Sequence, residues 1–154
     1  TRDCASDGGT NVEQTLVFST AWWKLVETHY EDAACTQASV RVVSEGPYHT
    51  GGFAAGGTEL DVSFSRTNAL ALSAEGASTL ESEGCGSGTW EVGASQDLQD
   101  GCANIVTSIN ACPTSYTVVD FGVGNALLFG DFGDGNCDEG SRSAATDATP
   151  WMLR

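Results

Sequence analysis

The chain has 154 residues, of which 40% are hydrophobic, and this is enough for one domain with a single core. Its 21 acidic residues oppose 6 Lys and Arg, which gives a formal net charge of −15. This charge excludes nucleic acid as a partner and disfavours an anionic membrane surface, because both require basic side chains. No apolar run reaches the roughly 18 residues of a membrane-spanning helix. We therefore expect one soluble domain over residues 1–154.

Apolar and polar residues alternate along most of the chain, and this period of two predicts β-strands. The first such region, Leu16–Tyr30, predicts two strands or one long bent strand. Its even positions carry Phe18, Trp22 and Tyr30, which predicts one aromatic face. Further strands are expected at Ala38–Ser44, Thr58–Ser65, Asn68–Leu72, Thr89–Val92, Tyr116–Phe121 and Ala126–Phe129.

Glycine-rich turn signals separate these strands, and Gly122–Asn125 is typical of a hairpin turn between the last two. Only Thr79–Glu83 and Leu98–Ser108 have helical patterns. Many short strands without alternating helices predict an all-β fold, either a single antiparallel β-barrel or a sandwich. We favour the closed barrel, because closure removes exposed strand edges.

The six cysteines are spread along the chain without the Cys-x-x-Cys spacing of zinc sites. They predict three disulfides in an oxidising compartment, so the protein is expected to be secreted, periplasmic or on the cell surface. The start at Thr1, without a leader, fits removal of a signal peptide or a trimmed chain. Sequence alone does not choose among the possible pairings, and short loops favour Cys4–Cys35, Cys85–Cys102 and Cys112–Cys137.

Aromatic, glycine, acidic and cysteine positions recur at a characteristic spacing: Phe18, Trp23, Tyr30, Asp32, Cys35, Gly46, Tyr48, Gly51, Gly57–Asp61, Cys85, Gly86, Trp90, Gly93, Asp97, Cys102 and Leu128–Gly130. This spacing resembles the extracellular domain of the adenomatosis-polyposis-coli down-regulated proteins, a family of animal Wnt inhibitors with bacterial and algal relatives. The resemblance implies a secreted, lipocalin-like β-barrel, which in the animal members holds a lipid moiety. The family's C-terminal Arg-Pro motif is missing, and Thr149-Pro150-Trp151 stands in its place.

Aromatic side chains on one strand face are suited to line a cup for an apolar ligand, although they fit a filled core equally well. The ligand-lining candidates are Phe18, Trp22, Tyr30, Tyr48 and Phe64. Two functions follow. The first is a secreted, non-catalytic module that binds an apolar small molecule or lipid. The alternative is a structural subunit that docks on a protein partner in a larger extracellular or cell-surface assembly.

The sequence has no catalytic signature. His29 and His49 are the only histidines, and no Gly-x-Ser-x-Gly elbow accompanies them. Carboxylate pairs such as Glu31-Asp32 are commonplace in so acidic a chain, so a hydrolase of extracellular polymers has no specific support. We expect no enzyme activity and assign no catalytic residues.

One acidic loop has the alternating oxygen ligands of a calcium site: Asp131, Asp134, Asn136 and Asp138. Glu139 stands where an EF-hand needs glycine, and Ala145 occupies its last ligand position. We therefore favour a solvated acidic loop and no cofactor. If an ion binds, calcium is the candidate, because the ligands are hard oxygens.

Overall fold

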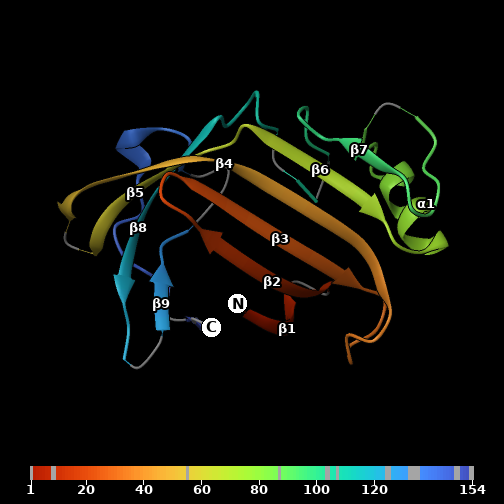
Figure 1. The fold of residues 1–154 in the computed structure, drawn as a ribbon, viewed down its shortest axis with the longest axis horizontal. Helices are drawn as coiled ribbons and strands as arrows, with labels where there is room; N and C mark the ends of the chain where they lie inside the picture. Colours follow the sequence, from red (N-terminus) through yellow and green to blue (C-terminus); the bar gives the residue numbers. More distant parts are fainter. Residues whose placement is uncertain are drawn as a thin grey trace.

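The computed structural model describes residues 2–7, 10–54, 56–86, 88–102, 105–106, 108–123, 126–131, 136–147 and 150–152. Strands predominate in this part of the chain (Figure 1). The elements in chain order are β1 (Arg2–Asp7), β2 (Thr10–Phe18), β3 (Trp22–Tyr30), β4 (Ala38–Ala54), β5 (Gly57–Ser63), β6 (Arg66–Ala71), α1 (Ala74–Ser82), β7 (Ser95–Asp97), β8 (Thr114–Phe121), β9 (Ala126–Phe129), the short 3-10 helix η2 (Glu139–Ser141) and β10 (Trp151–Met152).

The strands form one antiparallel sheet in the order β1-β2-β3-β4-β5-β8-β9-β10, with β6 paired to β4 and β7 paired to β6. Strand β4 is 17 residues long and holds the sheet together. Its first part pairs with β3 and β6, and its second part pairs with β5. The sheet thereby curls into a half-barrel (Figure 1). The structure confirms the antiparallel β fold.

The half-barrel is not closed by strand pairing between its two ends, since β1 and β10 have no such pairing among the described residues. Side chains meet across the opening instead. The ring of Phe18 on β2 stacks on that of Phe129 on β9, with centroids 6.0 Å apart. The terminal strand β10 spans only Trp151–Met152, which is too short to make a full ladder with a neighbour.

The region Leu16–Tyr30 contains two strands, because the chain turns between β2 and β3. The Ser19 backbone N–H donates to the Trp22 carbonyl at 2.8 Å and closes this turn. In the resulting register Phe18 lies opposite Trp23. Side chains that lie opposite each other point to the same face. The prediction that Phe18, Trp22 and Tyr30 share a face is therefore wrong, because the turn between the strands shifts the alternation by one residue.

The concave face of the sheet carries two apolar clusters. One lies under helix α1 and contains Val40, Val42, Ala69, Ala71, Ala77, Leu80, Cys85, Trp90 and Leu98. The other lies toward β5 and β9 and contains Trp23, Leu60, Val62, Phe129 and Trp151. Figure 1 shows α1 at one end of the sheet, with β5 and β8 at the opposite end.

Helix α1 begins after Ser73, whose side chain accepts a hydrogen bond from the Gly76 N–H at 3.0 Å. It starts five residues before the predicted helical window and ends at Ser82. The second predicted helix, Leu98–Ser108, is wrong for its described residues, which form turns and an isolated bridge. Thr89–Val92 is not a strand either, and β7 forms a few residues later.

Three disulfides link Cys4 to Cys35, Cys85 to Cys102 and Cys112 to Cys137, as the short-loop pairing predicts. The Cys85–Cys102 bridge fastens the chain after α1 to the loop that follows β7, so it holds the helix-covered end together. Within the described residues, no helix is both long enough and apolar enough to cross a membrane.

Candidate functional site

The candidate site is a cavity of about 380 Å³ on the concave face of the half-barrel. Strands β2 and β3 form one wall, and β9, β10 and the loop after β7 form the other. Its apolar lining consists of Leu16, Trp23, Leu25, Phe64, Ile105, Val106, Cys112, Phe129 and Trp151. A volume of this size lies in the range of small-molecule sites, about 300–1,000 Å³.

Aromatic rings set the shape of this cavity. Trp23 is 1% exposed, and its indole N–H donates to the Ser63 carbonyl at 2.9 Å, which fixes the ring in the wall. The ring of Phe64 stands edge-on to Trp23, with centroids 5.0 Å apart. On the opposite wall Trp151 stands edge-on to Phe129 at 6.0 Å. These contacts hold two tryptophans in fixed positions around the space, which favours a preformed apolar site.

The polar lining is acidic. Glu27 accepts a hydrogen bond from the Gln14 amide at 2.7 Å, and both residues line the cavity. Asp131 and Asp147 line it as well, together with Ser44 and Thr67, whose hydroxyls are hydrogen-bonded to each other at 3.1 Å. No Lys, Arg or His belongs to the described lining.

A second cavity of about 340 Å³ adjoins the first on the concave face. It lies between the end of β3 and helix α1 and is lined in part by His29, Glu31, Glu75 and Glu83. Ile105 lines both cavities, so the two spaces are neighbours on either side of this side chain. Burial lowers the pKa of His29, and the nearby Glu27 carboxylate only partly offsets this effect, so His29 is neutral at pH 7.

Three of the five predicted lining residues belong to the aromatic end of the concave face. Phe64 lines the first cavity, and Phe18 and Tyr48 pack against its aromatic cluster with ring centroids 5.0 Å apart. Trp22 is 43% exposed and lies on the opposite face of β3. Tyr30 lines the second cavity, and its hydroxyl donates to Glu13, a hydrogen bond that raises the pKa of Tyr30.

Sequence reasoning missed several lining residues for two reasons. Trp23, Leu25 and Glu27 occupy the odd positions of β3, and the alternation offered no reason to prefer them over the even positions. Ile105 and Trp151 come from irregular or terminal segments, where no periodic signal exists. The sequence signal that could have located the cavity was the presence of aromatic residues on both sides of the turn between β2 and β3.

The proposed calcium loop is only partly described, because Asp134 lies outside the described residues. Asn136 is buried, and its amide nitrogen donates to the Asp131 carbonyl at 2.6 Å and the Ser143 hydroxyl at 3.0 Å. The Asp138 backbone is bound to the Ser141 side chain, whose hydroxyl donates to the Asp138 carbonyl at 2.8 Å. Across the described residues, no group of three or more His, Cys, Asp or Glu side chains is arranged to hold a metal ion.

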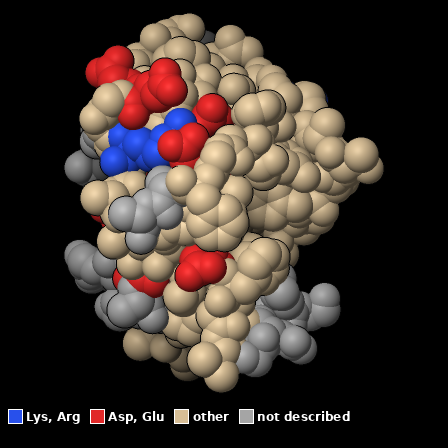
Figure 2. Space-filling view, turned by 90° about the vertical axis from the view of Figure 1, so that its left-hand side faces the viewer, with Lys and Arg blue, Asp and Glu red and all other residues tan. Residues whose placement is uncertain are grey.

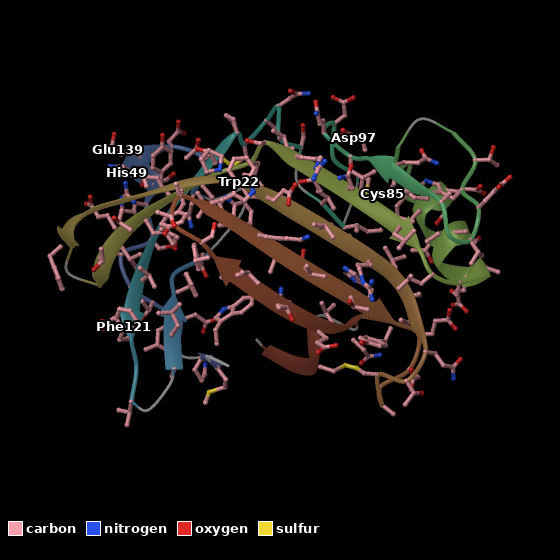
Figure 3. The ribbon with its side chains drawn as sticks, viewed as in Figure 1. Trp22, His49, Cys85, Asp97, Phe121 and Glu139 are labelled. Carbon is pink, nitrogen blue, oxygen red and sulfur yellow. A yellow bond between two sulfur atoms is a disulfide. The ribbon has the colours of Figure 1, made fainter. Side chains whose placement is uncertain are left out.

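The outer face of β5 and β8 carries an ion-pair network around Arg142. Its guanidinium lies 2.7 Å from the Asp61 carboxylate and 5.3 Å from the centre of the Tyr116 ring. This pairing fastens the segment after η2 to the sheet. Figure 2 shows basic side chains flanked by acidic ones on this end of the molecule. Both histidines are far from forming a pair, since His49 is exposed at this end and His29 lines the second cavity (Figure 3).

In comparisons with known proteins, no protein-family model and no curated protein matches the chain.

Proposed function

We propose that this chain is a secreted, non-catalytic binding module whose first cavity takes an apolar or lipid-like ligand. The observation that carries the proposal is the cavity of about 380 Å³ between Trp23 and Trp151, which the fold leaves open on its concave face. Burying an apolar chain there contributes about 25 cal/mol per Å² of surface removed from water. The resemblance to the family of Wnt inhibitors supports the same kind of ligand.

The secreted location is supported by the three disulfides, which persist in oxidising compartments. The non-catalytic assignment is supported by the character of the cavity. Its described lining combines aromatic and aliphatic walls with carboxylates.

A second function, docking on a larger assembly, is favoured by a different observation. Phe121 is 77% exposed at the end of β8, and Val123, two residues further along the chain, is 100% exposed. Figure 3 shows Phe121 projecting from this end. Exposed apolar side chains that lie together are typical of protein interaction surfaces.

Two neighbouring residues on β2 provide a matched test. Leu16 lines the cavity, whereas Val17 is 52% exposed on the other face of the sheet. Leu16→Trp is expected to fill the cavity and weaken binding of the neutral fluorophore N-phenyl-naphthylamine by at least about tenfold, equivalent to about 1.4 kcal/mol. Val17→Trp, which adds the same bulk outside, should leave binding unchanged.

Native mass spectrometry of the parent protein should in addition detect a co-purified apolar molecule, lost in Leu16→Trp. Equal fluorophore binding by the parent and both variants would overturn the cavity as the binding site. A parent that binds neither fluorophore nor lipid, but whose self-association or partner binding is lost in Phe121→Ser, would establish the docking function instead.

A further inference from the structure

The concave face changes from aromatic to acidic along the strands. Its side chains on β3 are, in order, Trp23, Leu25, Glu27 and His29. The register places Phe18 beside Trp23, Leu16 beside Leu25, and Gln14 beside Glu27 on β2. Both strands therefore become more polar in the same direction, toward the second cavity.

The second cavity extends the acidic end. Glu31, Glu75 and Glu83 line it, and Ile105 lies between it and the first cavity. His29 is the single histidine, lysine or arginine in the described lining of the two cavities. Because burial lowers the pKa of His29, its ring contributes no positive charge at neutral pH. Asp131 and Asp147 also line the first cavity, so the groove is acidic along its whole length, while its wall on β3 changes from Trp23 and Leu25 to Glu27 and His29.

Basic side chains of the same strands lie on the opposite face of the sheet. In the register Lys24 lies opposite Glu45, and Glu45 lies opposite Arg66, so these three share the outer face. Arg41 lies on that face too, opposite Thr28. The Arg66 guanidinium is paired with Glu45 there. The Lys and Arg side chains of these strands therefore lie on the face of the sheet away from Glu27 and the groove.

We infer that the groove binds a cationic amphiphile, with its aliphatic chain along Leu16 and Leu25 toward Trp23 and its ammonium group at Glu27, facing the acidic second cavity. The inference rests on the proposed binding function and specifies its ligand class. Trp23 and Glu27 are four residues apart along β3, about 13 Å, which suits a chain of the length of dodecyl. An ammonium group beside a partly buried carboxylate gains charge-assisted hydrogen bonds, whereas a carboxylate ligand meets like charge.

The dispersed arrangement of the carboxylates favours an organic cation over a metal ion. Among the described residues no three acidic or histidine side chains converge closely enough to coordinate an ion. A metal needs several ligands at about 2.0–2.6 Å, whereas an alkylammonium group is stabilised by carboxylates spread along a groove.

Three ligands of equal chain length test the inference: dodecylamine, dodecanol and dodecanoate, each below its micelle-forming concentration at pH 7. Displacement of N-phenyl-naphthylamine measures their affinities. The amine is expected to bind at least about tenfold more tightly than the alcohol, and the carboxylate more weakly than either. Because the preference is electrostatic, it should decline as salt is raised.

Glu27→Gln keeps the shape of the side chain and a hydrogen-bonding partner for Gln14. It is expected to reduce the amine-over-alcohol preference about fivefold while leaving dodecanol affinity unchanged. Glu139→Gln is the matched control, because Glu139 is exposed on η2 at the far end of the molecule (Figure 3). Glu75→Gln, at an exposed position of α1, should reduce the preference in the same direction and remains usable if Glu27→Gln does not fold.

Equal affinity for amine and alcohol in the parent would overturn the inference and leave the binding function standing. A preference that survives both Glu27→Gln and Glu75→Gln would overturn it too, since the selectivity would then arise elsewhere. Failure of all three ligands to bind would count against the proposed function itself and the inference with it.

Discussion

The two ends of the concave face belong to the same sheet but differ in how their side chains pack. At one end α1 packs Ala77 and Leu80 onto β4 and β6 in a buried cluster, and the second cavity of about 340 Å³ lies beside it. At the other end the aromatic cluster around Trp23 and Phe129 borders an open cavity of about 380 Å³. One end behaves as a core and the other as a site.

Side-chain size explains the difference. The sheet under α1 presents Ala69 and Ala71, and the helix presents Gly76, so the two backbones approach closely. A Cβ on Gly76 would collide with the Ser39 carbonyl. At the other end, rings that are locked against each other and against the backbone, such as Trp23 on Ser63, keep the walls apart. Small residues thus permit a filled core, and anchored large ones preserve a cavity.

The largest expected effect comes from truncating one leucine at each end. Leu80 is 0% exposed in the filled cluster, so Leu80→Ala should cost about 2–5 kcal/mol of unfolding free energy. Leu25 is half-buried on the wall of the open cavity, and Leu25→Ala should cost less than about 2 kcal/mol. Equilibrium denaturation by urea measures both. Equal losses would mean that the two ends do not differ as core and site.

Gly76→Ala tests the close approach of helix and sheet. Helix propensity alone would make alanine more favourable than glycine by about 1 kcal/mol. Because the new methyl group meets the Ser39 carbonyl, we expect the opposite sign, a net loss of about 1–3 kcal/mol. A stabilised variant in thermal or urea unfolding would contradict the packing described for α1. Glu75→Ala, one residue earlier and exposed, is the control for helix propensity.

The smallest effect concerns pH and His29. Its pKa in the folded protein is lowered by burial, whereas the unfolded chain has the ordinary value of about 6.5. At pH values well above about 6.5, the His29 ring is neutral in both the folded and the unfolded state. As pH falls below it, the unfolded state binds the proton first, so stability decreases until the folded-state pKa is passed. His29→Gln should flatten the decline in urea midpoint between pH 7 and pH 5.

His49→Gln is the matched control for that measurement, because His49 is exposed on the outer side of the sheet. Asp32 does not interfere in this pH range. Hydrogen bonds from Gln37 and Thr36 lower its pKa, so its contribution to stability is lost only in more acidic solution. A pH dependence that is the same in the parent and in His29→Gln would exclude His29 as its source.

The presence of a strand could be predicted from the sequence where apolar and polar residues alternate strongly. Both strands within Leu16–Tyr30 and those at Ala126–Phe129 and near Thr58–Ser65 are present. The long β4 was predicted only in its first part, because Gly46-Pro47 looks like a turn. In the structure β4 continues through Gly46, where the Ser63 carbonyl lies so close that no side chain would fit. A local turn signal was thus overridden by a tertiary contact.

The sequence by itself indicated the antiparallel β class and the presence of three disulfides, because alternation and the number and spread of cysteines need no tertiary information, and short loops favoured the pairing that the structure has. Only the tertiary structure decided which tryptophan faces inward. Trp22 and Trp23 are adjacent and chemically identical, and their exposures of 43% and 1% follow from the strand register. A shift of one residue exchanges the two faces of a strand, and register is fixed by contacts with neighbouring strands that no local pattern contains.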